Sequence, residues 1–105
     1  MVDLKADTEQ ILKDHDAIID YSDEFVGVDG KIYHLPEMGG WGLTWPRGTI
    51  TLSFDSEEKC RFEAAVFIYL FEKGVDVCTA RQMAYLFVKD QYESQRHLEQ
   101  LWQRT

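Results

Sequence analysis

The sequence has little of three things that often identify a small protein: cysteine, long apolar runs, and positive charge in its first third. Only Cys60 and Cys78 are present in 105 residues, too few for a disulfide framework and without metal-ligand spacing. No apolar stretch approaches the roughly 20 residues that a membrane-spanning helix needs. The N-terminal MVDLKADTEQ is polar and acidic, unlike a secretory signal. We therefore expect no membrane association and a cytoplasmic location.

Catalytic signatures are missing as well. The chain has no glycine-rich phosphate loop, no G-x-S-x-G, no H-E-x-x-H and no Cys-x-x-Cys. Its three histidines, His15, His34 and His97, fall in three different predicted elements. A metal site built from His15 with Asp14 or Asp16 is disfavoured, because adjacent residues of a helix point to different faces. We predict a protein that is not an enzyme, with no metal and no cofactor.

The composition that remains is that of a folded chain. Hydrophobic residues make up 45% of the sequence and aromatic residues 13%, which argues against disorder despite a net charge of −8. A chain of this length can bury one core without metal or disulfide support. We predict a single domain over residues 1–105.

The charge is unevenly distributed along the chain. Residues 1–30 hold nine acidic residues against two lysines, a net charge of −7, whereas residues 31–105 carry only −1. Phosphates are bound by Lys and Arg, so this distribution disfavours direct binding of nucleic acid. It favours a protein partner with a basic surface.

An amphipathic helix is predicted over residues 1–21. Ile11, Leu12, His15, Ile18 and Ile19 recur at helical spacing and fall within a 120° arc. In that helix Glu9, Asp16 and Asp20 would cluster roughly opposite the apolar stripe.

The pattern of residues 24–54 predicts a four-stranded antiparallel meander. Asp29-Gly30 is a strong hairpin signal, since a type I′ turn needs positive φ at both positions. Pro46-Arg47-Gly48 marks a second bend. In the return strand Ile50 alternates with Thr49 and Thr51, so one sheet face is packed and the other wet.

Two helices complete the predicted α+β fold, both packed on one sheet face. The first covers residues 55–74, opened by a capping box of Asp55 with Glu58 and stopped at Gly74. The second covers residues 79–103, opened by Thr79 with Gln82.

The segment PEMGGWGLTWPRG supports two interpretations. Gly39, Gly40 and Gly42 with the two tryptophans could form a stacking platform for a base, a sugar or a partner side chain. Strict alternation instead places Trp41, Leu43 and Trp45 on one face, which would be the core. We favour the core, although a bulge at the glycines could turn Trp41 outward.

The acidic first third also has two interpretations. It is either a solvated surface that maintains solubility or a functional docking face. The carboxylates continue beyond the predicted helix through Asp23 and Glu24 with few basic residues between them. Uncompensated like charge destabilises a compact state by self-repulsion, and a basic partner would offset that cost.

In its length, its lack of catalytic signatures and the acidity of DTEQILKDHDAIIDYSDE, the chain resembles the small acidic inhibitors carried by phages and mobile elements, the anti-CRISPR and anti-restriction proteins. The resemblance implies a cytoplasmic protein of a bacterial host cell that blocks a basic nucleic-acid-binding surface of a defence complex. On that interpretation carboxylates stand where phosphates would lie, with aromatic anchors beside them. The implied partner-binding residues are Glu9, Asp16, Asp20, Asp23 and Glu24, with Tyr21 and Trp41 as anchors.

Three other hypotheses remain open. An immunity protein or antitoxin against a basic nuclease has similar size and charge. A small-ligand binder would use Trp41, Trp45 and Tyr33. A phage assembly or structural protein could form a homodimer through the C-terminal helix, using Leu98, Leu101 and Trp102.

Overall fold

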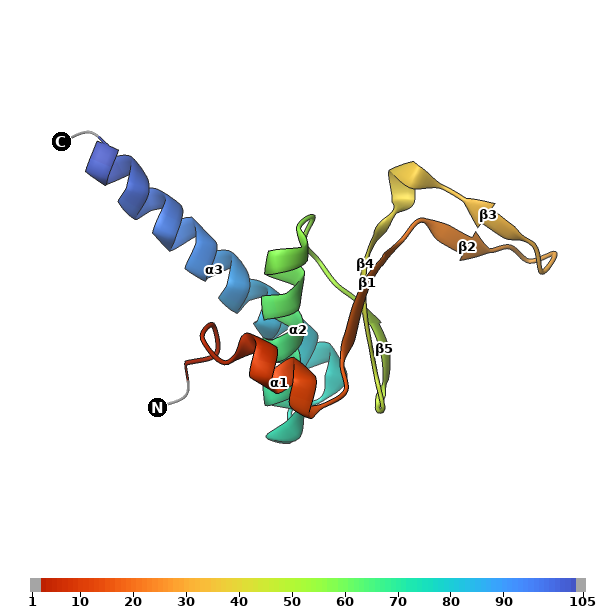
Figure 1. Cartoon of the computed structure of the whole chain (residues 1–105), viewed down its shortest axis with the longest axis horizontal. Helices are drawn as coiled ribbons and strands as arrows, with labels where there is room; N and C mark the ends of the chain where they lie inside the picture. The colour runs from red at the N-terminus through yellow and green to blue at the C-terminus, as the bar shows by residue number, and fades with distance from the viewer. Residues whose placement is uncertain (1–2, 104–105) are drawn as a thin grey trace.

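The computed structural model describes the backbone of residues 3–103 and the side chains of residues 3–93. The fold is α+β, as predicted, with three helices and two antiparallel sheets of three and two strands (Figure 1). Along the chain the elements are α1 (Thr8–Asp14), β1 (Ile18–Ser22), β2 (Glu24–Val26), β3 (Ile32–His34), a short 3₁₀ helix η1 (Pro36–Met38), β4 (Gly40–Trp45), β5 (Gly48–Thr51), α2 (Glu57–Glu72) and α3 (Val77–Gln103).

The strands do not form the predicted single meander. The larger sheet has the order β1-β4-β5, and β2 and β3 pair only with each other. The strand missing from the prediction is β1, which pairs with β4 so that Ile19 lies opposite Leu43. Ile50 of β5 continues this row on the core side of the sheet.

The predicted N-terminal helix over residues 1–21 is therefore wrong in its second half. α1 ends at Asp14, and the backbone N–H groups of His15 and Ala17 both return to the carbonyl of Leu12. Asp16 follows in the left-handed region at φ 53°, which turns the chain out of the helix. The β-branched Ile18 and Ile19 then suit a strand better than a helix, and Ile19 is buried there.

Both predicted hairpins are present. Pro46-Arg47 connects β4 to β5 before Gly48 at φ 138°, and β2 and β3 flank a turn that contains Gly30 at φ 79°. The predicted type I′ geometry at Asp29-Gly30 is wrong, because Asp29 does not have positive φ. The connection instead spans residues 27–31, closed by the Gly27 N–H donating to the Lys31 carbonyl at 2.9 Å.

Both predicted capping boxes are displaced. Ser56, rather than Asp55, caps α2 and accepts a hydrogen bond from the Lys59 N–H. α3 begins at Val77, two residues before the predicted start, and the Asp76 carboxylate accepts from the Thr79 N–H. Gly74 ends the preceding turn at φ 96°, as predicted.

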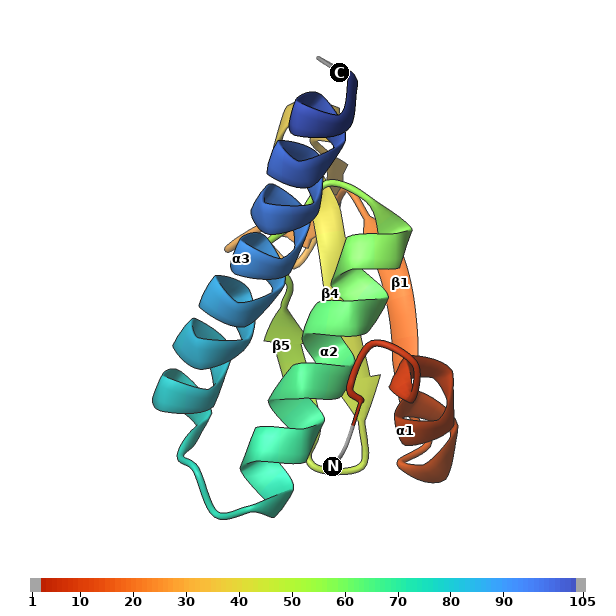
Figure 2. The ribbon, with the colours of Figure 1, turned by 90° about the vertical axis from the view of Figure 1, so that its left-hand side faces the viewer.

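The core lies between the larger sheet and α2. The Trp45 ring of β4 meets Phe67 and Phe71 of α2 edge to face, with centroids 6.1 Å and 5.5 Å apart. α3 packs on α2 through the buried Ala80, Ala84 and Val88. All three helices lie on the same side of the sheet (Figures 1 and 2).

The molecule is extended for its length. Its radius of gyration is 15.9 Å, against about 13 Å for a compact domain of this size. The β2–β3 hairpin projects at one end of the long axis, and α3 runs past the end of α2 at the other (Figure 1). We call residues 23–38, which contain β2, β3 and η1, the hairpin arm.

Candidate functional site: an acidic hollow on the open sheet face

The larger sheet has one face covered by helices and one face open. Because side chains alternate along a strand, the residues next to the buried Ile19, Leu43 and Leu52 point the other way. We call this open side the outer face; its residues are Ile18, Asp20 and Ser22 of β1, Gly40, Gly42 and Thr44 of β4, and Thr49 and Thr51 of β5. It is polar and built from small residues, so it presents a shallow floor.

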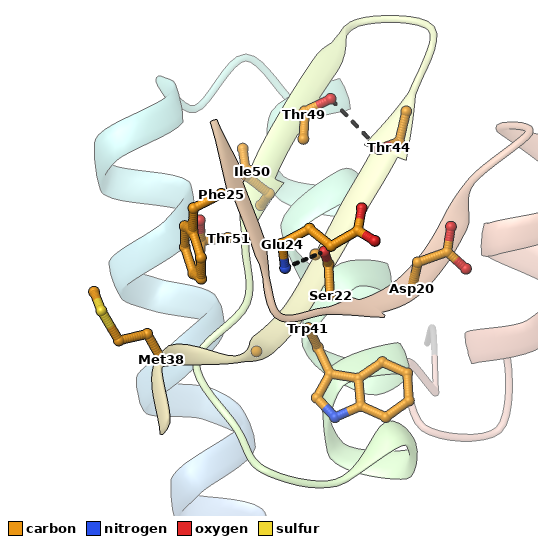
Figure 3. Close-up of a pocket in the computed structure, with 12 residues that line it drawn as sticks. Asp20, Ser22, Glu24, Phe25, Met38, Trp41, Thr44, Thr49, Ile50 and Thr51 are labelled. Atoms are coloured by element: carbon orange, nitrogen blue, oxygen red, sulfur yellow. Dashed lines mark hydrogen bonds between the residues drawn. The ribbon is translucent and has the colours of Figure 1, made fainter. Parts of the chain in front are cut away.

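The hairpin arm overhangs this floor and creates a hollow of about 410 Å³ (Figure 3). We call it the outer hollow. Its lining comes from β1, β4, β5 and the arm: Asp20, Ser22, Glu24, Phe25, Met38, Gly40, Trp41, Gly42, Thr44, Thr49, Ile50 and Thr51. The hollow therefore combines residues from Asp20 to Thr51, which lie 31 positions apart in the sequence.

Two carboxylates border the outer hollow. Asp20 lies opposite Gly42 in the β1–β4 pairing, so no neighbouring side chain on β4 covers it. Glu24 begins β2, where its N–H donates to the Ser22 hydroxyl. No Lys or Arg is among the described lining residues, and the described ion pair of Glu24 is with His34, at 3.8 Å between Oε1 and Nε2. Among the side chains of residues 3–93, the lining of the hollow thus contributes negative charge and no Lys or Arg.

Apolar groups stand beside these carboxylates. Phe25 is 37% exposed and Met38 61% exposed, and both line the hollow from the arm, on the side away from Asp20 and Glu24 (Figure 3). Lys and Arg side chains have an apolar stem and a charged head. A hollow with carboxylates at one side and Phe and Met at the other matches both parts of such a side chain.

The five carboxylates predicted to bind a partner do not lie on one helix face. Asp20 and Glu24 share the outer hollow, and Asp23 follows β1 with its carboxylate 3.6 Å from His34 Nδ1. Asp16 lies in the turn between α1 and β1, at the opposite end of β1 from Ser22. Glu9 lies on α1, away from the hollow.

Glu9 also differs in its electrostatics. Arg61 of α2 donates to both of its carboxylate oxygens, with Nε 2.7 Å from Oε1. This hydrogen-bonded pairing holds the pKa of Glu9 below its ordinary value. Arg61 is 52 residues away in the sequence, so the pairing is a tertiary contact that composition could not reveal.

The two predicted aromatic anchors, Tyr21 and Trp41, lie on the opposite sheet face from Asp20. Trp41, Leu43 and Trp45 share the helix-covered face, so the predicted core orientation is confirmed. The Trp41 ring points away from the outer-face threonines in Figure 3 and meets Tyr21 edge to face at 5.6 Å. Tyr21 remains 52% exposed at the end of β1.

A ligand platform of Trp41, Trp45 and Tyr33 is not formed. Trp45 is buried beneath α2, whereas Tyr33 lies on the hairpin arm and donates its hydroxyl to Asp29 at 2.6 Å. The three rings belong to separate surroundings, so they do not offer one stacking surface.

Sequence reasoning missed the residues that complete the hollow. Phe25 and Met38 were unremarkable members of a strand and a loop, and Ser22 and the threonines carried no motif. The signal that could have drawn attention to them is the run of small residues Gly39, Gly40 and Gly42, which marks a place where a strand leaves space.

The described histidines and cysteines are not gathered into a metal site. No three His, Cys, Asp or Glu side chains among residues 3–93 are placed to hold a metal ion. His15 directs Nδ1 to the Ile11 carbonyl at 2.8 Å and packs beside Trp45. Burial raises the pKa of the Cys60 thiol to about 11, which keeps it protonated, and Cys78 is exposed.

Two further findings bear on the class of protein. In the part of the chain that the structure describes, every helix is too short or too polar to traverse a lipid bilayer. Comparison with family models, with curated proteins and with solved structures finds no match. A function must therefore be inferred from the site itself, which is the open, acidic and partly apolar sheet face of a small α+β protein.

Proposed function

We propose that the protein is a non-enzymatic inhibitor that binds a basic surface of a nucleic-acid-handling protein complex and blocks it. The observation that carries the proposal is the outer hollow, where Asp20 and Glu24 stand beside Phe25 and Met38 on a sheet face that no helix covers. Lys and Arg side chains of the partner enter the hollow and meet carboxylates that have no Lys or Arg beside them in the described lining.

The same charges account for speed and selectivity of association. Residues 1–30 carry a net charge of −7, which attracts a basic partner to the molecule and repels nucleic acid. The apolar contacts of Phe25 and Met38 then slow dissociation. The partner's basic surface would otherwise bind phosphates, so its occupation by this protein inhibits nucleic-acid binding.

The structure favours a localised contact over an extended phosphate mimic. Glu9 is occupied by Arg61 and Asp16 lies in a turn at the far end of β1. We therefore assign partner binding to Asp20, Glu24, Phe25 and Met38. Tyr21 is left out because it shares the face of Trp41, opposite to that of Asp20. Asp23 precedes Glu24 in the chain but does not line the hollow. A host defence complex and a basic nuclease toxin would both present Lys and Arg side chains to this site. The identity of the captured protein distinguishes these two partners.

The test is a pull-down from bacterial lysate at low and high salt, with identification by mass spectrometry. The variant Asp20→Asn/Glu24→Gln removes both charges of the hollow. The matched control Asp16→Asn/Asp55→Asn removes the same total charge at exposed positions outside the hollow. We expect a nucleic-acid-handling protein that is retained by the wild type and the control at low salt, released at high salt, and lost from the hollow variant.

A second step separates binding from inhibition. With the captured protein purified, its binding to a labelled nucleic acid is measured as this protein is added. We expect competition by the wild type and at least tenfold weaker competition by Asp20→Asn/Glu24→Gln. Equal competition by the hollow variant and the control would refute the assignment of the site, and binding without competition would refute the inhibitory function.

A further inference from the structure

Apart from the outer hollow, the hairpin arm carries an apolar surface without any cover. Val26 and Ile32 are paired across the hairpin and so share one of its faces, and both are exposed, Val26 by 74% and Ile32 by 62%. Val28 is fully exposed in the turn beyond them. We call these three residues the arm surface. No arm residue belongs to the buried core. An isolated two-stranded hairpin is marginally stable in water, so an arm of this composition gains stability when another surface covers it.

A second uncovered apolar surface lies on α3. The buried Ala80, Ala84 and Val88 face α2, but Met83, Leu86 and Phe87 are 40–53% exposed. These three residues are spaced i, i+3 and i+4, so they are neighbours on one side of the helix. We call them the helix stripe.

We propose that two copies of this chain form a symmetric dimer in which the arm surface of each copy packs on the helix stripe of the other. The arm surface and the helix stripe together expose on the order of 800 Å² per copy, taking roughly 200 Å² for a fully exposed residue of this size. Stable interfaces bury about 800 Å² per partner. The helix stripe alone provides about a third of that area, so a pairing of two stripes is too small.

Charge selects the same arrangement. The hairpin arm, residues 23–38, contains four acidic residues and one lysine, a net charge of −3. Two arms placed against each other would meet with like charge, which is destabilising. The sequence of α3, residues 77–103, contains three acidic and three basic residues, so an arm meets no net repulsion there.

The reciprocal exchange also closes the assembly. A single contact between an arm and a helix stripe is head-to-tail and would leave one arm and one stripe exposed. A two-fold axis between the copies forms two such contacts at once, so both arm surfaces and both helix stripes are covered. The inference is independent of the basic partner, because Phe25 and Met38 of the outer hollow are not part of the arm surface.

The test is sedimentation velocity of the full chain over a dilution series at micromolar concentration. The arm variant Val26→Thr/Ile32→Thr keeps β-branched residues in both strands while it removes apolar surface. The helix variant Met83→Gln/Leu86→Gln keeps good helix formers. The control is Ile18→Thr, the same change as in the arm at a residue 55% exposed on the outer face.

We expect a dimer for the wild type and for Ile18→Thr, and at least tenfold weaker dimerisation of the arm variant and of the helix variant. Circular dichroism and melting of each variant check that it is folded. Mixing the two variants provides the decisive experiment: the mixed dimer contains one intact arm–stripe contact, whereas each variant alone contains none.

Recovery of dimer on mixing supports the exchange. A wild type that is monomeric at every concentration would overturn the proposal. So would dimerisation that survives both variants, or dimerisation that Ile18→Thr weakens as much as the arm variant does. A mixture no more dimeric than its components would exclude the pairing of arm with stripe.

Discussion

The two tryptophans of β4 provide a matched pair for testing the fold, because Trp45→Ala and Trp41→Ala are the same substitution on one strand. Trp45 is buried, with its ring near His15, Phe67 and Phe71. Trp41 is half-buried, and its described ring contact is with Tyr21. We expect a larger loss of stability at position 45.

The size of each loss follows from burial and ring contacts. Removal of a buried Trp side chain costs roughly 3–5 kcal/mol, and Trp45 belongs at the upper end because its ring is buried and contacts both Phe67 and Phe71 of α2. Each edge-to-face pair adds about 0.5–1.5 kcal/mol beyond area burial. Trp41, with part of its ring in water and one such pair, is expected to cost about 2 kcal/mol. Against a total stability of ~5–15 kcal/mol for a single domain, Trp45→Ala leaves the fold marginal.

Urea unfolding followed by far-ultraviolet circular dichroism measures both variants under one condition. With a slope of about 1–3 kcal/mol per M for a small protein, a difference of 2–3 kcal/mol separates the two midpoints by roughly 1 M or more. If the variants lost equal stability within about 0.5 kcal/mol, or Trp41→Ala lost more, Trp45 would not be the centre of the core and the packing argument would be wrong.

Three further predictions concern single positions. Asp16→Gly raises the unfolding free energy relative to Asp16→Ala by about 1 kcal/mol, since glycine accepts φ 53° without strain; equal midpoints in urea would contradict this. Gly39→Ala lowers the melting temperature and displaces Tyr21, because an added Cβ would overlap the Tyr21 hydroxyl oxygen; an unshifted Tyr21 ring resonance in NMR would count against it. Burial raises the pKa of Glu63 above its ordinary value of 4.5, although the Ser53 N–H donates to its carboxylate at 2.7 Å. The folded state therefore binds that proton more tightly than the unfolded state, so stability falls as pH rises from 4.5 through the raised pKa, and Glu63→Gln removes this fall in urea unfolding measured against pH; a variant with the same pH profile as the wild type would refute the assignment.

Local features of the fold were predictable because they depend on residues close together in the chain. Gly30 and Gly74 have the positive φ that their turns require, and only glycine adopts it without cost. Alternation of Ile50 with Thr49 and Thr51 correctly separates the packed and wet faces of β5. The core orientation of Trp41 and Trp45 follows from the same period of two.

Whether residues 18–22 form a helix or a strand depended on tertiary contacts. Ile18 and Ile19 continue a helical spacing begun by Ile11 and Leu12, so the local pattern favours one long helix. The strand is preferred because Ile19 gains burial opposite Leu43, more than twenty residues away, and the left-handed Asp16 allows the change of direction. The hydrophobic periodicity of a short sequence segment contains no information about a partner strand that far along the chain.

The sequence by itself determined the acidity of the first third, the turns, and the burial of alternate residues, since each depends on composition or on neighbours. Only the tertiary structure decided which carboxylates act together. It placed Asp20 and Glu24 with Phe25 and Met38 around one hollow and paired Glu9 with Arg61. A sheet brings together residues from strands far apart in the chain, so the site exists only once β1 has paired with β4 and the hairpin arm has been positioned above them.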